Sequence, residues 1–522
     1  MKIKKILVPE NFFIALILLI NLIKLLKLDG GFVLGEPDER NYVDVVRNLR
    51  SSPYPQFDGT PFLHSLPAFH YLALPLSFIF PVQYLAVRLV SWLAGLLLSL
   101  AIYWYLKEKF SKTIGLAGAI IFSILPLAVF YTRLGLLESL LSFFVVAFIF
   151  SFDKAVNSKS EKWAAISGIF LAAAVLTKYT ALPFIALPVI IFAFIALGEL
   201  QSKGLRFLLK LKEWCRLAKI HLITLLTSSF VVFPPIIFIY SHDPLEFRTQ
   251  LRYILSFGQD KTTFTALKFL LPNLSEYLSW PILILFIVGL AYLLFTLKIK
   301  KIWIFTTGFL LISFFVLRAN LIGPRYFMIL TPFVAVFAAI TLGKILEVVG
   351  SKVWWSTPLV LISTVGLIFP SSWLAIESTH HDIIERVGNF VKEQRKDEWV
   401  FSNYWPSAFV DTIGTYKITW LSGGLEDSNS LSGKKNSKYQ SLNEPSLPYG
   451  SLSYVSREGG FVILEEEYSK DFINASAREG AAIPIKGSNQ PIKEFEDYSP
   501  NYPFSKETPN KIFIYKIAGI QK

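Results

Sequence analysis

The sequence has very little cysteine. Cys215 is the only one among 522 residues, so no disulfide can form within the chain. His380, His381 and Asp382 stand together without the ligand spacing of a metal site, and we interpret them as solvated surface. The sequence also lacks a solenoid-type repeat and lacks paired apolar segments broken by Gly or Pro. These absences argue against a disulfide scaffold, a repeat protein and an inverted-repeat transporter.

Apolar residues, by contrast, are abundant. They make up 53% of the chain, with 46 Phe and 12 Trp, and the mean hydropathy is +0.49. A soluble protein of this size is far less apolar, so we expect a polytopic α-helical membrane protein. The net charge of +13 does not indicate a nucleic-acid partner, because much of the Lys and Arg lies in short connections between apolar runs.

Eleven apolar segments are long enough to cross about 30 Å of hydrocarbon. We place them near residues 8–28, 82–106, 113–131, 136–152, 163–178, 181–198, 219–240, 280–297, 302–317, 324–343 and 353–373. The first follows Lys2, Lys4 and Lys5 as a signal peptide would, but no convincing small-residue cleavage site comes after it. We therefore interpret it as a retained first span.

The connections between these segments predict the orientation of the chain. Lys and Arg concentrate after the second, fourth, sixth and eighth segments, and cytoplasmic connections are rich in these residues. They are Lys107, Lys109, Lys112, Lys154, Lys159, Lys162, Lys203, Arg206, Lys210, Lys212, Arg216, Lys219, Lys298, Lys300 and Lys301. The pattern predicts a multi-pass protein of the cell membrane with a cytoplasmic N-terminus, and with residues 29–81 and everything after Phe369 outside.

Two outer connections are unusually long. In the first, residues 29–81, the stretch Phe62 to Phe80 is apolar and aromatic but interrupted by Pro67 and Pro75. We expect an interfacial helix along the outer membrane face there. The second runs from Ser241 to Ser279, with a helical pattern from Leu245 to Phe257. Both are placed to roof a site.

The composition changes to that of a soluble domain after about residue 374. A helix is predicted at Ile383–Val391, and strands at Trp399–Ser402, Tyr416–Leu421, Phe461–Leu464 and Lys511–Ile517. Residues 422–446 form a polar run that we expect to be a mobile loop. The sequence thus predicts a membrane domain over residues 1–373 and an extracytoplasmic α/β domain over residues 374–522.

Asp38 and Glu39 stand side by side just after the first span. A carboxylate close to hydrocarbon is costly, so it tends to serve as general base, ion ligand or substrate contact. The alternative is a solvated helix start, since Pro37-Asp38-Glu39 suits the first turn of a helix.

Further charged residues lie on the same predicted outer face. Glu138 and Arg133 occupy the turn before the fourth span, where they either serve a site or simply pair at the interface. Lys178 follows the fifth span and Arg325 opens the tenth. Carboxylates beside fixed cations suit a phosphate-bearing substrate whose leaving group needs its charge stabilised.

These motifs together resemble a known class. Asp38-Glu39 with Tyr42, the turn from Arg133 to Glu138, Leu176-Thr177-Lys178 and Pro324-Arg325-Tyr326 are similar to those of polyprenyl-phosphate-dependent glycosyltransferases of the GT-C class. The nearest groups are the protein O-mannosyltransferases and the lipid A aminoarabinose transferases. The resemblance covers residues 1 to about 345; the outer domain fits in placement alone.

The resemblance implies transfer of a sugar from a polyprenyl-phosphate carrier to a protein, lipid or glycan hydroxyl on the outer face, with inversion. Asp38 would be the general base, with Glu39 and Glu138 as further catalytic acids. Arg133, Lys178, Arg325, Tyr326 and His64 would bind the donor phosphate, while Arg40 and Tyr42 would position the acceptor or the loop. His64 stands where relatives carry a basic residue before Pro-Pro. No cofactor is implied with certainty; a divalent ion, if one is used, would bind Asp38 and Glu138.

Two other classes compete with this hypothesis. A transporter or lipid flippase also has many spans, but it predicts ionisable groups near the bilayer midplane, whereas the charges here cluster at outer span ends. A non-catalytic scaffold gives no reason for acids and cations to share one face. The sequence leaves the sugar, the acceptor and the carrier lipid open.

Overall fold

The structure is a computed structural model of the whole chain. The residues it describes are 10–28, 38–57, 60–63, 66–80, 83–203, 211–256, 265–296, 298–318, 323–350, 356–379, 383–396, 398–402, 413, 418–420, 460–465, 491–496 and 511–517. The predicted mobile loop at residues 422–446, the predicted phosphate ligand His64 and the pair His380-His381 lie outside these residues. The chain divides into two compact units, Met1–Leu28 with Tyr42–Ile376, and Asp29–Asn41 with Glu377–Lys522.

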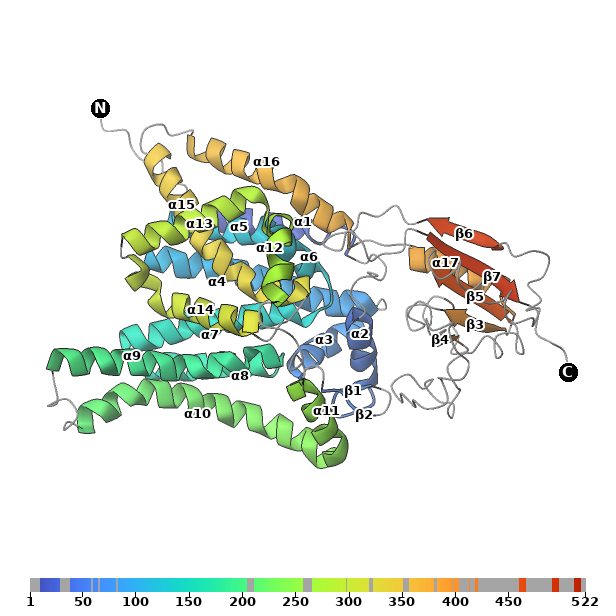
Figure 1. Ribbon diagram of the computed structural model, residues 1–522, viewed down its shortest axis with the longest axis horizontal. Coiled ribbons are helices and arrows are strands. Elements are labelled where there is room, and N and C mark those ends of the chain that lie inside the picture. Colours follow the sequence, from blue (N-terminus) through green and yellow to red (C-terminus); the bar gives the residue numbers. More distant parts are fainter. Residues whose placement is uncertain are drawn as a thin grey trace. The chain divides into compact units, whose positions relative to one another are not determined.

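The first unit is helical and apolar (Figure 1). Within the described residues, six helices are long and apolar enough to cross a membrane, and eight spans result if each of two bent helix pairs counts as one. The chain is therefore a membrane protein, as predicted. All eleven predicted segments fall on helices, but α1 (Glu10–Ile23) and α8 (Glu161–Val175) have only 14 and 15 residues, and the count of eleven spans stays a prediction.

The helices pack as a continuous series. α10 (Leu211–His242) packs on α8, α8 on α7 (Leu137–Ser158), α7 on α4 (Gln83–Lys109), and α4 on α5 (Lys112–Ile124). α15 (Thr331–Gly350) then joins α5 to α13 (Trp280–Phe295). Three further helices of this unit are α9 (Ala186–Lys203), α14 (Trp303–Arg318) and α16 (Ser356–Glu377). Figure 1 shows the long α10 lying beside α8.

Two helix pairs are bent, one of them within a predicted segment. The segment expected at 113–131 consists of α5 and α6 (Pro126–Arg133), which meet at 62°. Pro126 explains the break, because proline donates no backbone hydrogen bond and clashes with the preceding turn. A second break, of 105°, separates α12 (Thr265–Leu278) from α13 at Ser279, whose φ of 64° is left-handed. Both bends redirect helix ends toward the same part of the bundle, since α12 packs on α6.

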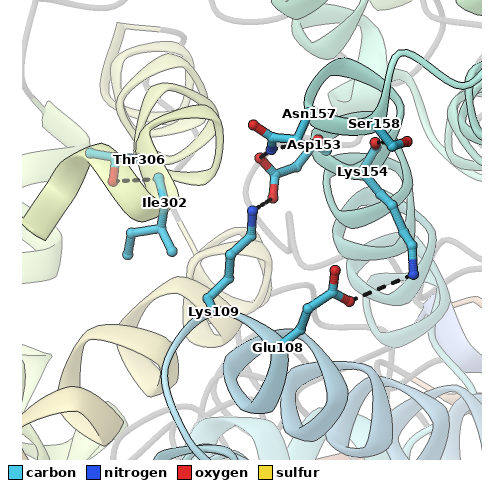
Figure 2. Close-up of polar contacts among 8 residues, drawn as sticks. All are labelled: Glu108, Lys109, Asp153, Lys154, Asn157, Ser158, Ile302 and Thr306. Atoms are coloured by element: carbon cyan, nitrogen blue, oxygen red, sulfur yellow. Dashed lines mark hydrogen bonds and ion pairs between the residues drawn. The ribbon is translucent and has the colours of Figure 1, made fainter.

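Polar side chains join the helices inside the bundle. Asn21 of α1 donates to Ser123 of α5 over 3.0 Å, and the Ser123 and Ser99 hydroxyls lie 3.0 Å apart. Near the C-terminal ends of α4 and α7, Lys109 forms an ion pair with the buried Asp153, which also accepts a 2.7 Å bond from Asn157 (Figure 2). Such bonds tie neighbouring helices together because a polar group in an apolar interior is costly when it has no partner.

The connection after α2 (Asp38–Asn48), predicted to lie outside, is compact. It consists of the short hairpin β1 (Gln56–Phe57) and β2 (Thr60–Pro61), followed by α3 (Ala68–Ile79), the helix predicted there. Tyr54 packs with Leu63 and with Ile239 of α10, and Phe247 of α11 (Pro244–Ser256) covers them. The two long predicted connections therefore share one apolar cluster.

The second unit contains a five-stranded mixed sheet in the order β4-β3-β5-β7-β6. β3 (Trp399–Ser402) runs parallel to β4 (Ile418–Trp420) and β5 (Gly460–Glu465), while β7 (Lys511–Ile517) is antiparallel to β5 and β6 (Lys493–Glu496). α17 (Ile383–Gln394) buries one face and packs against β6. β3 and β7 have the predicted bounds; β6 was not predicted.

Candidate active site

The centre of the candidate site is an ion pair between two predicted residues. Glu138 lies in the first turn of α7 and is 4% exposed. Lys178 precedes the 3-10 helix η1 (Tyr179–Ile185), and its Nζ donates to Oε1 of Glu138. The other carboxylate oxygen, Oε2, is buried and accepts no hydrogen bond from the described residues. Glu138 is therefore a half-satisfied acid, which in an apolar interior is costly.

An aromatic ring extends the pair toward a second cation. The Lys178 ammonium lies 5.1 Å from the centre of the Tyr326 ring, and the Arg325 guanidinium lies 5.2 Å from the same ring. Arg325 and Tyr326 belong to the 3-10 helix η4 (Pro324–Leu330). The face of an aromatic ring attracts cations, so Tyr326 holds two positive charges close together.

Local backbone geometry presents these cations. Gly323 precedes η4 with φ +136°, a conformation that residues with a Cβ rarely adopt. Thr177 caps the end of α8 by donating to the Ala173 carbonyl over 2.7 Å, and Lys178 then turns the chain into η1. η1 and η4 both pack against α7. Three segments far apart in the sequence thus bring Glu138, Lys178, Arg325 and Tyr326 together.

The predicted acids Asp38 and Glu39 form the first turn of α2, with Arg40 next to them. Asp38 is half-buried, whereas Glu39 and Arg40 are buried. The helix start predicted at Pro37-Asp38-Glu39 is thus confirmed from Asp38 onward, but Glu39 is buried and not solvated. Acids at that place favour the helix, because its N-terminus carries partial positive charge.

Tyr42, one turn further along α2, is fixed by aromatic neighbours. Its ring centre lies 6.2 Å from Phe62, 6.0 Å from Phe69 and 5.5 Å from His70. His70 is fully buried in α3, and burial lowers its pKa to about 3, so the imidazole is neutral at pH 7. α3 is joined to the Lys178 segment, since the Ala68 N–H donates to the Leu176 carbonyl over 3.0 Å.

Arg133 is placed differently from the other predicted cations. It is 1% exposed, and its guanidinium donates to the carbonyls of Lys24 and Lys27, just after α1. Arg88, a buried residue of α4 that the sequence analysis did not single out, donates to the Leu28 carbonyl over 3.0 Å. Carbonyls at the end of a helix lack partners within the helix, and arginine satisfies them well. The signal for Arg88 was a lone arginine within an apolar segment.

Metal ligands are not clustered in the described part of the chain, where no group of three or more His, Cys, Asp or Glu is placed to hold an ion. Instead, an ammonium group lies on Glu138.

Comparisons with known proteins found one family model and several solved structures. Residues 64–238, about a third of the chain, match the family model described as dolichyl-phosphate-mannose-protein mannosyltransferase. ArnT from Cupriavidus metallidurans, solved bound to undecaprenyl phosphate, is 11% identical with a TM-score of 0.63, and 97% of each chain is covered. The archaeal oligosaccharyltransferase AglB from Archaeoglobus fulgidus, in complex with an inhibitory peptide and a dolichol-phosphate, is 13% identical with a TM-score of 0.55, covering 89% of this chain and 71% of AglB. No curated protein sequence matches.

The structural similarities show the fold, which is that of GT-C membrane proteins. Together with the family match, they confirm the resemblance predicted from the sequence: the chain is related to the polyprenyl-phosphate-dependent glycosyltransferases.

Proposed function

We propose that this protein transfers a sugar from a polyprenyl-phosphate carrier to an acceptor hydroxyl on the outer face of the membrane, with inversion at the anomeric carbon. The observation that carries the proposal is the cluster of Lys178, Tyr326 and Arg325 in a chain related to such transferases. Two cations held close to one ring suit a monoanionic or dianionic phosphate. The lipid tail of the donor would lie among the apolar helices.

Lys178 and Arg325 are the residues best placed to hold the donor phosphate. Both side chains are only partly buried, so an anion can reach them. A donor-phosphate role has less support for Arg133, because its guanidinium is occupied by carbonyls after α1. His64 remains a prediction from the sequence. The comparison proteins support a lipid-phosphate ligand, since one was solved with undecaprenyl phosphate and another with a dolichol-phosphate.

In the proposed step, Asp38 takes the proton of the acceptor hydroxyl while the hydroxyl oxygen attacks the anomeric carbon. The bond between that carbon and the phosphate oxygen breaks, and the polyprenyl phosphate leaves with the electron pair. Lys178 and Arg325 stabilise the charge that develops on the departing phosphate. The carboxylates of Glu39 and Glu138 would assist by orienting the acceptor, with Arg40 and Tyr42 shaping the α2 turn that carries Asp38.

The test compares sugar release from radiolabelled polyprenyl-phosphate sugars by the wild type, Lys178→Gln and Arg325→Gln. Each substitution should lower turnover about 100-fold or more, as expected when a group that stabilises transition-state charge is removed. Lys162→Gln is the matched control, because Lys162 is exposed at the opposite end of the helix that precedes Lys178. Full activity in both site variants would refute the assignment of the phosphate site.

A further inference from the structure

We propose that Glu138 is the resident counter-ion of Lys178, and that the donor phosphate binds by replacing it. The inference rests on the proposed function, because it concerns the same phosphate site. It assigns Glu138 a role as a positioning residue that sets the affinity for the lipid phosphate.

The first argument is the unequal burial of the two partners. The Glu138 side chain is 5% exposed and the Lys178 side chain 13%. Tyr326, whose ring centre lies 5.1 Å from the lysine ammonium, and Arg325 are also partly exposed. An incoming anion therefore meets Lys178 and Arg325 first, while Glu138 lies behind them.

The second argument is the incomplete bonding of the carboxylate. Oε1 accepts from Lys178, but Oε2 accepts nothing from the described residues. A buried carboxylate that accepts several hydrogen bonds is held firmly in a structural ion pair. The Glu138 carboxylate is held by a single ammonium group. Lysine suits an exchange of partners, because its ammonium is a compact charge on a flexible stem with three donors.

The third argument is the charge balance of the cluster. Without Glu138, Lys178 and Arg325 would repel each other across one ring when no substrate is bound. Glu138 offsets one of these charges in the empty site, and the phosphate offsets it in the filled site. The release of Glu138 upon phosphate binding leaves a carboxylate beside the reacting groups, where it can accept a hydrogen bond from the acceptor.

The experiment is a double-mutant cycle on the binding of polyprenyl phosphate to the purified full chain. Wild type, Glu138→Gln, Lys178→Gln and the double variant are compared by the Kd for this lipid. If Glu138 competes for Lys178, Glu138→Gln should bind about fivefold more tightly when Lys178 is present and unchanged when it is absent, as expected for directly coupled residues. The exposed pair Glu161 and Lys219, 2.5 Å apart, is the matched control and should show no effect on lipid binding.

Each other outcome overturns the inference. Equal tightening in both backgrounds would mean that Glu138 merely repels the phosphate, and weaker or unchanged binding in Glu138→Gln would mean that it does not compete. If Glu138→Gln does not fold, Glu138→Asp serves instead, because its shorter side chain withdraws from Lys178 and should tighten binding in the same lysine-dependent way. A wild type that binds no polyprenyl phosphate would refute the proposed function itself.

Discussion

We predict that a small change to the ion pair between Lys109 and Asp153, the substitution Asp153→Asn, causes a large loss in the free energy of unfolding. Asp153→Asn keeps the size of the side chain but removes the charge that faces Lys109 (Figure 2). The side chain of Asp153 is 2% exposed and that of Lys109 is 18% exposed. Breaking a buried pair costs about 3–5 kcal/mol, because the remaining charge is left without compensation.

The partial exposure of Lys109 places the expected cost at the lower end of that range, about 3 kcal/mol, because its ammonium can still reach water. The same figure contains the control: Glu108 and Lys154 lie 3.6 Å apart with exposures of 62% and 41%. Glu108→Gln should change the free energy of unfolding by less than about 1 kcal/mol.

The assay is unfolding of the purified protein in detergent, with the wild type, both single variants and the pair Lys109→Met with Asp153→Leu. The double variant should recover most of the stability lost in Asp153→Asn, since a well-packed apolar pair often replaces a buried ion pair without loss. If Asp153→Asn is no less stable than Glu108→Gln, the pair does not hold α4 and α7 together as argued.

Three further predictions concern the outer face. His70 is buried with its pKa lowered to about 3, so below pH 6.5 the folded protein binds fewer protons at this residue than the unfolded chain does. The free energy of unfolding that depends on neutral His70 should be fully present above pH 6.5, and it should fall by about 1.4 kcal/mol per pH unit as the pH decreases from 6.5 toward about 3. This component should be missing from the pH profile of His70→Phe, and an unchanged profile would contradict the burial argument. Gly323→Ala should lower the free energy of unfolding by about 1–3 kcal/mol, because alanine is strained at φ +136°. It should also reduce activity by displacing Arg325. Wild-type activity in this variant would show that η4 tolerates the change. Arg133→Lys should destabilise the fold by about 1–2 kcal/mol while leaving the Kd for polyprenyl phosphate nearly unchanged; a large loss of affinity would instead assign Arg133 to the phosphate site.

Hydrophobic patterning predicted much of the helical architecture. Each apolar segment falls on a helix, because burying such segments in lipid or protein is the only way to satisfy their backbone groups. The bends at Pro126 and Ser279 were not predicted. A proline indicates where a helix can break but not the angle between the two parts, and the left-handed conformation of Ser279 has no sequence signal. Similarly, β6 was not predicted, because Phe495 is its only large apolar residue and its sequence therefore lacks the alternating apolar pattern of a strand. In the structure β6 pairs with β7.

The candidate site was predicted as a set of residues but not as a set of pairs. The sequence predicted Glu138 and Lys178 on one face, and the alternative was that Glu138 pairs at the membrane interface with Arg133, which occupies the same turn. In the structure Glu138 pairs with Lys178, 40 residues away, while Arg133 faces the end of α1. Partners of this kind depend on how helices pack, and a single sequence gives no measure of that.

The most direct test of the central claim is a comparison of wild type and Asp38→Asn in reconstituted membranes, with a panel of radiolabelled polyprenyl-phosphate sugars. We expect that the wild type releases sugar from at least one donor, and that Asp38→Asn is slower by a factor of about 100 or more while still binding polyprenyl phosphate. An Asp38→Asn variant that transfers sugar at the wild-type rate would contradict the assignment of the general base. Lipid movement without sugar release from any donor would contradict the proposed transferase and favour a transporter.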